Sequence, residues 1–281
     1  MNANQGQIEE WNGGSGERWL RYQERLDDAL APFGAAALDA ASPGAGERVL
    51  DVGCGCGATT LELARRVGAD GYVLGADISA PMVERARVRA REQTPSPEFQ
   101  LADASRLVFD GERFDLLFSR FGVMFFDQPV PAFAHLRSLL RPGGRLVFAC
   151  WRPLAENEWV TLPLEVARPW LPDTPPADPH APGPFALSDS DRTRRILTEA
   201  GFGYVLVRPF DAGMRIGTGV TALQDAAEYL FQIGPTARQL REQAGPAQAE
   251  IRQAILRELT SRHRPEGVVL NAAIWIVTAV A

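Results

Sequence analysis

Short apolar runs alternate along the chain with longer segments in which apolar residues recur at helical spacing. Between residues 48 and 151, five runs predict strands: RVLDVG, YVLGADIS, FQLAD, FDLLFSRF and RLVFACW. The segment GATTLELARRVG, where Leu61, Ala64 and Val67 recur on one side, predicts a helix, and so do the segments after YVLGADIS and before RLVFACW. Repeated strand-then-helix order predicts an α/β fold with a mostly parallel sheet and helices on both faces.

The boundaries of several helices can be placed from residues that cap or break helices. Ser79 is expected to cap the helix after YVLGADIS. Ser188 and Asp191 fit a capping pattern for a helix that runs to Ala200 and is ended by Gly201. The later runs YVLVRPF and VVLNAAIWIVTAVA add two strands, so the predicted sheet has seven strands in all.

These patterns divide the chain into four parts. Residues 1–45 are expected to form an N-terminal helical cap, and residues 46–152 the strand-and-helix core. Residues 153–187 form a proline-rich insertion or lid, because the prolines there break long helices and central strands. Residues 188–281 complete the core and include a helical lid insertion at about 212–264.

Composition and charge narrow the function. Hydrophobic residues make up 46% of the 281 residues and charged ones 23%, as in an ordinary globular protein. All 29 basic residues are arginine, so a Walker A phosphate loop and Schiff-base chemistry, both of which need lysine, are excluded. The net charge of −6 disfavours a nucleic-acid partner. No signal peptide or membrane-spanning run is visible, so we expect a cytoplasmic protein with no membrane partner.

The candidate chemistry centres on the segment VLDVGCGCGA, residues 49–58. Gly53, Gly55 and Gly57 fall where the first strand meets its helix, so the backbone can turn sharply and a ligand can approach the peptide groups closely. The same glycines also satisfy the dinucleotide fingerprint GxGxxG/A, with Asp77 at the distance expected for a ribose-binding acid. The spacing alone therefore allows either of two adenosine-containing cofactors.

The ordered set of motifs resembles the class I S-adenosylmethionine-dependent methyltransferases, in particular the type 11 or UbiE-like members. VLDVGCGCG is similar to motif I of that family, with Asp51 as its acidic residue. Asp77 in GADIS, Asp103 and Ala104 in LADAS, the run FDLLFSR and the run LRPGGRLVF follow in the family's order. The resemblance is strong over residues 47–152 and implies a Rossmann-like sheet, with S-adenosylmethionine as the methyl donor and S-adenosylhomocysteine as the product.

The resemblance also assigns roles to individual positions. The turn from Gly53 to Gly57 would hold the methionine part, Asp77 both ribose hydroxyls, and Asp103 the adenine amine. The full set of implied cofactor contacts is Trp19, Asp51, Gly53, Cys54, Gly55, Thr59, Asp77, Ile78, Met82, Asp103, Ala104, Ser119, Arg120 and Phe121.

Simpler explanations hold for other residues that could carry chemistry. Cys54 and Cys56 lack the further ligands of a tetrahedral site, so we expect no metal and interpret them as small buried side chains. Asp51 is interpreted as structural, bonded to loop amides beneath the cofactor. The pocket for the acceptor is expected to include Phe125, Phe126, Trp151 and His180, and of the aromatic residues near it, including Phe121 and Trp159, we expect most to be core and a minority to touch substrate.

The implied reaction is an in-line displacement on the methyl carbon, in which positioning supplies most of the acceleration. No catalytic residue is assigned, because a base is needed only if the acceptor arrives protonated. We expect a small-molecule acceptor. The alternatives are a methyltransferase acting on RNA or protein, an NAD-dependent oxidoreductase, and a non-catalytic nucleotide-binding module. The sequence identifies neither the acceptor nor the oligomeric state.

Overall fold

The computed structural model describes residues 4–172 and 178–281, so Pro175 and Pro176 of the expected insertion lie outside the described residues. One mixed sheet runs through the molecule in the order β3-β2-β1-β4-β5-β8-β6, and β7 pairs with β8. The strands are β1 Arg48–Val52, β2 Tyr72–Asp77, β3 Glu98–Leu101, β4 Phe114–Arg120, β5 Leu140–Trp151, β6 Gly203–Gly217, β7 His263–Arg264 and β8 Gly267–Val280. All seven strands expected from the sequence are present, and β7 is a two-residue addition.

The direction of the strands fixes where a ligand can bind. β1 to β5 pair in parallel, whereas β8 lies antiparallel between β5 and β6. β1 has β2 on one side and β4 on the other, so the strand order reverses there. Ligands of such sheets bind at the carboxyl ends of the strands beside that reversal, which places the loops after β1 and β4 at the expected position.

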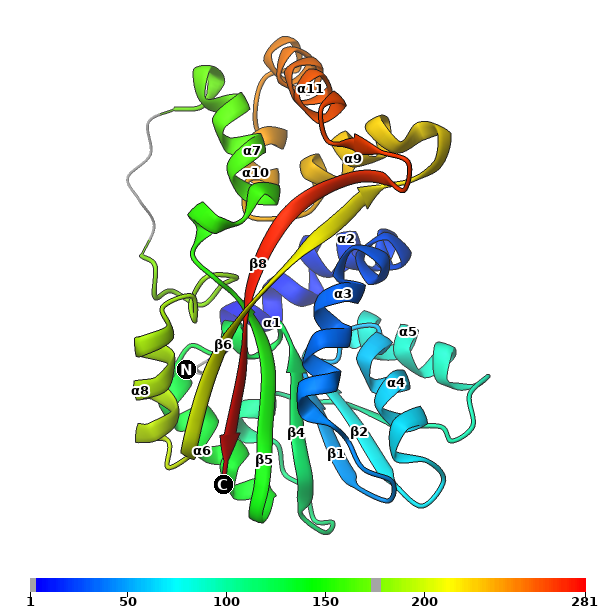
Figure 1. Cartoon of the computed structure of the whole chain (residues 1–281), viewed down its shortest axis with the longest axis vertical. Coiled ribbons are helices and arrows are strands. Elements are labelled where there is room, and N and C mark those ends of the chain that lie inside the picture. The colour runs from blue at the N-terminus through cyan, green and yellow to red at the C-terminus, as the bar shows by residue number, and fades with distance from the viewer. Residues whose placement is uncertain (1–3, 173–177) are drawn as a thin grey trace.

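Helices cover both faces of the sheet, as the alternating pattern predicted (Figure 1). α3, α4 and α5 pack on one face, and α6 and α8 on the other. Their bounds are α3 Gln23–Ala41, α4 Ala58–Val67, α5 Ala80–Ala90, α6 Pro129–Leu139 and α8 Ser190–Glu199. With both faces covered, Leu50, Leu116 and Phe118 of the central strands are completely buried. This is why β1 and β4 are continuous apolar runs and do not alternate with polar residues.

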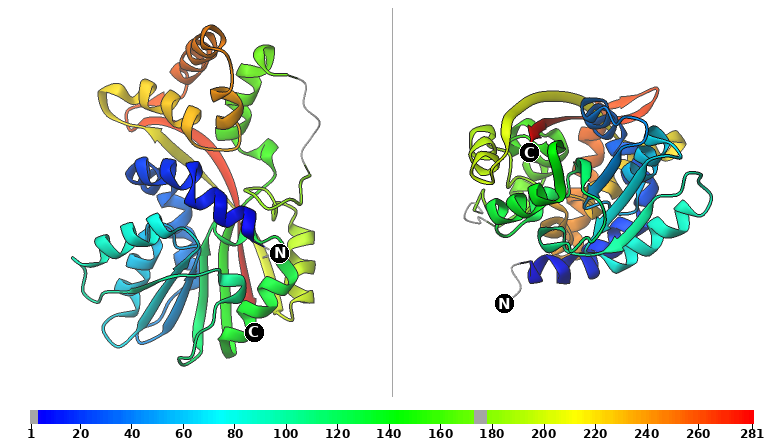
Figure 2. Two further views of the ribbon diagram at one scale, coloured as in Figure 1. Left: turned by 180° about the vertical axis from the view of Figure 1, so that it is seen from behind. Right: turned by 90° about the horizontal axis from the view of Figure 1, so that it is seen from below.

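Two strands continue beyond the rest of the sheet and carry a second group of helices. β8 pairs with β5 only from Ile274 onward, and its earlier part pairs with β6 and, at Gly267 and Val268, with the short strand β7. Above this two-stranded arm lie α7 Glu158–Ala167, α9 Ala222–Gln232, α10 Ala237–Arg241 and α11 Gly245–Thr260, called here the upper helices. α1 Gln5–Asn12 and α2 Gly14–Arg21 cross between the sheet and the upper helices (Figure 2).

Two segments differ from the sequence-based expectation in their secondary structure. β6 continues to Gly217, so residues 212–217, which were expected in a helical lid, are strand, whereas α9, α10 and α11 follow within the expected lid. α7 forms inside the proline-rich region, with Pro163 in its interior. Its buried residues Trp159, Val160 and Leu162 explain this, because their packing offsets the backbone hydrogen bond that a proline removes.

Of the two predicted helix caps, one was wrong in position and the other is in place but makes a different hydrogen bond. The cap of α8 is Asp189, not Ser188, and its carboxylate accepts from the backbone N–H groups of Asp191 and Arg192. Ser79 does occupy the cap position of α5, but its hydroxyl donates to the carbonyl of Trp11 at 2.7 Å, and the side-chain oxygen of Asn12 accepts the first N–H of the helix, that of Ala80, instead. A charged acceptor binds amide donors more strongly than a hydroxyl, and Trp11 offers Ser79 a partner from a distant helix.

Candidate functional site

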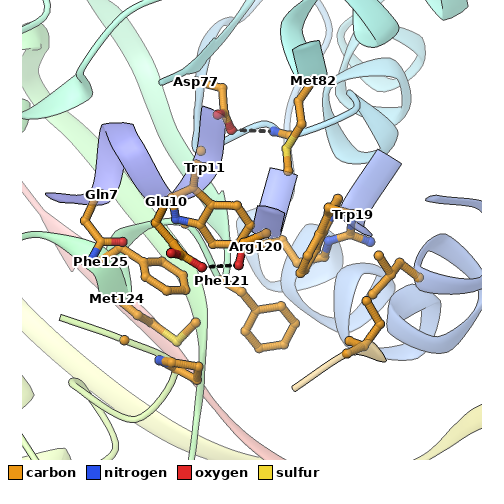
Figure 3. A pocket seen from close by; sticks show the side chains of 18 of the residues that line it. Gln7, Glu10, Trp11, Trp19, Asp77, Met82, Arg120, Phe121, Met124 and Phe125 are labelled. Carbon is orange, nitrogen blue, oxygen red and sulfur yellow. Dashed lines mark hydrogen bonds between the residues drawn. The ribbon is translucent and has the colours of Figure 1, made fainter. Parts of the chain in front are cut away.

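A cavity of about 470 Å³ lies between the carboxyl ends of the parallel strands, the N-terminal helices and the upper helices. This volume is within the usual range of small-molecule sites. In the close view of Figure 3, Asp77 and Met82 lie on one side of Trp11, and Phe121, Met124 and Phe125 lie on the other. The cavity is therefore one continuous space, with polar residues at the end that lies against the sheet and aromatic residues at the other end.

In the turn after β1, neighbouring atoms leave no room for a side chain at Gly53, whereas Gly55 faces the cavity. Gly53 has a φ of +69°, and a Cβ added there would lie 2.6 Å from the Cα of Gly122. A Cβ on Gly55 (φ +53°) would instead project toward Met82 Sδ and Trp19 Nε1, each 3.9 Å away. Gly53 thus lets two backbones touch, whereas Gly55 leaves a cradle open to the cavity that a side chain would fill.

Asp77 ends β2 with its carboxylate fixed beside this cradle. One oxygen accepts the backbone N–H of Gly55 at 2.8 Å (the dashed line at Asp77 in Figure 3), and the other accepts that of Ser79 at 2.9 Å. Burial raises the pKa of Asp77, and these backbone donors oppose the rise. A carboxylate has about four acceptor positions, so this one can still receive hydroxyl groups from the cavity.

Asp51 lies beneath the turn and does not line the cavity. Its Oδ2 accepts the hydroxyls of Thr59 and Thr60, each at 2.7 Å, and not the loop amides we expected. The amide of Gly53 already bonds to a carbonyl of β2, so the threonines at the start of α4 are the available donors. Its Oδ1 is buried without a hydrogen-bond partner among the described residues, and burial raises the pKa of Asp51 to about 6.

Asp103 lies at the cavity wall but is already hydrogen-bonded. The Asn4 side-chain amide donates to both of its oxygens at 2.9 and 3.0 Å, and the Ser105 backbone N–H donates to Oδ1. The Asn4 carbonyl oxygen in turn accepts the N–H of Asp127. Sequence reasoning missed Asn4, because a polar residue ahead of a helix gives no sign of a partner far along the chain.

Adjacent residues at the end of β4 point in different directions. Ser119 is fully buried, donating to the Val52 carbonyl at 2.7 Å and accepting from the Gly122 N–H, so it joins β1 to β4. It does not line the cavity, contrary to the prediction, because alternate residues of a strand face opposite sides. Arg120 and Phe121 do line it. The backbone of Phe121 has a φ of +66°, which residues other than glycine rarely adopt.

Aromatic side chains form the other end of the cavity. The Phe121 ring stacks on Trp151 with centroids 4.2 Å apart, and Trp151 contacts Trp159 at 4.8 Å. Phe125 meets Trp11 edge-on at 5.2 Å. All five aromatic residues weighed from the sequence line the cavity: Phe121, Phe125, Phe126, Trp151 and Trp159. Phe121, Trp151 and Trp159 are also buried in the hydrophobic core, so the expectation that most of the five are core is confirmed.

His180 does not belong to this end of the cavity. It is exposed, its backbone N–H bonds to the Asp178 carboxylate, and it is absent from the cavity wall. Pro182, Gly183 and Pro184 of the same segment line the cavity instead. His180 was predicted because histidine is a common acid or base, but the residues of this segment that line the cavity are glycine and proline, which have no polar side chain.

Comparison with known proteins gives the family. Residues 49–144 match the family model described as a methyltransferase domain, which covers β1 to the start of β5. Residues 49–144 therefore form a methyltransferase domain. Its glycine turn, Asp77 and Asp103 all fall within the matched residues.

The methyltransferase domain has similar proteins of known name. Aklanonic acid methyltransferase DauC of Streptomyces sp. strain C5 is 38% identical over 120 residues, 42% of this chain and 54% of that protein. Nocamycin O-methyltransferase of Saccharothrix syringae is 36% identical over 138 residues, 48% and 49% of the two chains. The chain spans about half the length of the curated relatives it matches. The solved YcgJ protein of Bacillus subtilis has the same fold, with a TM-score of 0.57 at 16% identity over 88% of this chain and 97% of that one.

A charged network joins the methyltransferase domain to α3. Asp27 of α3 lies 2.9 Å from Arg89 of α5 and 3.8 Å from Arg120 at the end of β4. Burial lowers the pKa of Arg120, and the nearby carboxylates of Asp27 and Asp51 oppose that effect. Asp27 and Arg120 both line the cavity, and only Arg120 was predicted.

Cys54, Cys56 and His135 have structural positions, and His263 lies at the surface. Cys54 and Cys56 are free and buried, and burial raises the pKa of both thiols, that of Cys56 to about 12. His135 Nε2 lies 3.0 Å from the Leu107 carbonyl, and His263 is exposed in β7. Within residues 4–172 and 178–281, no group of three or more His, Cys, Asp or Glu side chains could hold a metal ion. No helix in that part of the chain is long and apolar enough to cross a membrane.

Proposed function

We propose that this protein transfers a methyl group from S-adenosylmethionine to a small-molecule acceptor. The observation that carries the proposal is the Asp77 carboxylate, held at the carboxyl end of β2 beside the open cradle at Gly55. Two of its acceptor positions are used by backbone N–H groups, and the remaining ones suit the two hydroxyls of a ribose.

The charge around the turn favours a cationic amino-acid nucleoside over a dinucleotide. Asp51 lies directly beneath the turn with one unpartnered buried oxygen, and Asp27 and Asp77 line the cavity beside it. A pyrophosphate bound at the same turn would meet these carboxylates, and like charges in a buried site repel strongly. The ammonium and sulfonium groups of S-adenosylmethionine would instead be stabilised there.

The residues at this donor end, which we define as the glycine turn with Asp77, Met82 and Asp103, would have separate tasks. Gly55 would leave room for the methionine part, and Ile78 and Met82 would pack on the adenine. Asp103 and the Ala104 backbone would bind the adenine amine, with Asn4 sharing the Asp103 carboxylate. Trp19 would cover the cofactor from α2.

The bound cofactor would supply an electrophilic methyl carbon for in-line attack by the acceptor. The chain itself would hold the acceptor in line and exclude water, which can supply several kcal/mol of the barrier reduction. We define the acceptor end as the aromatic residues Phe121, Phe125, Trp151 and Trp159 together with the upper helices. Its enclosure by apolar rings favours a small aromatic or otherwise hydrophobic acceptor over RNA or protein. The two named relatives act, by their names, on small molecules, which supports this choice.

The same reasoning gives the parts of the chain their proposed roles. Residues 1–45 and the helices between β6 and β8 would close the cavity over both substrates, with residues 182–184 as one side of the wall. Such enclosure is how many transferases keep water from the reacting atoms.

Isothermal titration with S-adenosylmethionine, S-adenosylhomocysteine and NAD⁺ tests the proposal directly. We expect saturable binding of the first two and none of the third. Incubation with S-adenosylmethionine and a panel of aromatic hydroxy and carboxylic acids should then release S-adenosylhomocysteine. Failure of both sulfur nucleosides to bind would refute the donor, and tight binding without turnover on any acceptor would favour a non-catalytic module.

A further inference from the structure

The charged residues that line the cavity are unevenly distributed. Near the sheet they are mainly acidic: Asp27, Asp77 and Asp103, with Arg120 among them. On the side of α2 and α10 they are mainly basic: Arg18, Arg238 and Arg241, with Glu10 of α1 nearby. The cavity therefore has a negative end, where a sulfonium cofactor would bind, and a positive end formed by elements outside the strand-and-helix core.

Two of the three arginines at the positive end have no carboxylate in a direct ion pair among the described residues. Arg238 pairs with Glu242 at 2.7 Å and is largely exposed. Arg18 is half-buried and donates to the Ser15 hydroxyl, which itself bonds to Glu10. Arg241 is half-buried, and its Nη1 donates to the carbonyls of Phe231 and Gln232 at the end of α9. Each keeps further N–H donors, since a guanidinium has five.

The surroundings of Arg241 indicate unbalanced positive charge. Burial and the neighbouring cation Arg18 lower the pKa of Arg241, Arg238 lowers it further, and Glu242 opposes them. Like charges held together at a cavity wall cost free energy, and a bound anion removes that cost. The planar forks of two arginines also match the geometry of a carboxylate better than any neutral group.

We propose that the acceptor is an anionic aromatic compound, whose rings lie among Phe121, Trp151 and Trp159 and whose carboxylate or similar anion is bound by Arg18 and Arg241. This inference rests on the proposed function for the identity of the donor, but the anion site is defined by its own residues. A cationic acceptor is excluded from this end by the same charges. The arginines are binding residues, and the structure gives them no part in the chemical step.

A pair of probes that differ in charge and little in shape tests the proposal on the wild-type protein. Naphthoate and its neutral amide, naphthamide, are titrated at neutral pH with and without saturating S-adenosylhomocysteine. Naphthoate should bind at least about tenfold more tightly, because hydrogen bonds to charged groups are the stronger ones. Added salt should weaken naphthoate binding and leave naphthamide binding nearly unchanged.

Variants then locate the anion. Arg18→Gln and Arg241→Gln should each reduce the preference for naphthoate, and the double variant should bring the ratio of the two dissociation constants close to one. Arg257→Gln, on the exposed side of α11 and away from the cavity, is the matched control and should keep the wild-type preference. Binding of S-adenosylhomocysteine should be preserved in all four variants.

The outcomes separate this inference from the proposed function. Equal affinity for the two probes, or binding of neither at millimolar concentration while S-adenosylhomocysteine binds, overturns the anion site alone. An undiminished preference in the folded double variant also overturns it. If naphthoate is preferred and lost in the variants but S-adenosylhomocysteine never binds, the donor assignment fails and the anion site stands.

Discussion

The two ends of the cavity are built in opposite ways. The donor end comes from short loops that directly follow β1, β2 and β3, so its residues lie close together in the sequence and on one edge of the sheet. The acceptor end combines the residues after β4, the end of β5 and the upper helices, which are separated by long stretches of chain. The comparison teaches that a site made by consecutive strand ends leaves a local signature, whereas a site assembled across the fold leaves almost none.

The largest effect on stability is expected at Gly53, where the donor end has no room for a side chain. Gly53→Ala would place a Cβ 2.6 Å from the Cα of Gly122 at a positive φ, so it should lower the free energy of unfolding by about 3 kcal/mol. Gly219→Ala is the control, because it has a similar φ of +67° and nothing within 4 Å of the added atom. It should lose only about 1 kcal/mol. Urea unfolding measures both, and equal losses would show that the close approach is unimportant.

Asp77→Ala tests whether the donor end binds a sugar diol. Removing a carboxylate that receives two hydroxyls should weaken S-adenosylhomocysteine binding by at least about 100-fold, since each charged hydrogen bond contributes about 1.5 to 3 kcal/mol. The exposed Asp70→Ala variant should bind like the wild type. Titration calorimetry compares the two. Near-normal affinity in Asp77→Ala would mean that the cofactor lies elsewhere in the cavity.

Asp51 should give the donor end a dependence on pH that the acceptor end lacks. Burial raises its pKa from 3.8 to about 6, so the folded protein holds this proton more tightly than the unfolded chain. The stability that this proton provides is therefore present at low pH and falls as the pH rises from about 4 to about 6. Between about pH 4.5 and 6.5 the loss should be about 2 kcal/mol.

Asp51→Asn removes that titration while keeping an oxygen for Thr59 and Thr60. The difference in unfolding free energy between wild type and variant should therefore change by about 2 kcal/mol across the interval, whatever other groups titrate. Urea unfolding at several pH values measures it. A constant difference would show that Asp51 is ionised to the same extent in both states.

The smallest effect is expected at the residue that sequence reasoning placed at the acceptor end without success. His180 is exposed and outside the cavity wall, so His180→Ala should leave S-adenosylhomocysteine affinity, naphthoate affinity and stability unchanged within error. Calorimetry and urea unfolding suffice to check it. A clear loss of naphthoate binding would mean that the segment around residue 180 takes another position when a ligand is bound.

The difference between the locally built donor end and the acceptor end, which is assembled from distant segments, also explains which parts of the fold and the site could be predicted from the sequence. The seven main strands and the glycine turn follow from local periodicity and from residues that only a few backbone conformations accept. The helix around Pro163 could not be found, because its formation depends on the packing of Trp159 and its neighbours against distant elements. Ser119 was misplaced for a related reason: its neighbour Arg120 faces the cavity, and sequence alone does not say which of two adjacent strand residues does.

Residues outside the motifs were missed because their partners are distant. Asn4 reaches Asp103, and Arg241 meets Arg18, only once the helices are packed on the sheet. Asparagine before a helix and arginine within one are common on any surface, so neither carries a signal of its own. The absence of lysine, by contrast, was informative, because a Walker A phosphate loop and Schiff-base chemistry both require that residue.

The long antiparallel pair β6 and β8 separates what is fixed in this molecule from what can be exchanged. The chain leaves the sheet after Gly217 and returns at the short strand β7, which pairs with the first residues of β8. Gly217 itself faces Val268 across the ladder between β6 and β8. An inserted segment whose two ends lie side by side can be replaced by a segment of another length or composition without moving the two strands to which it is attached. Residues 218–266 thus form a cassette that could be exchanged to give this scaffold another acceptor, while the proposed donor end stays unchanged.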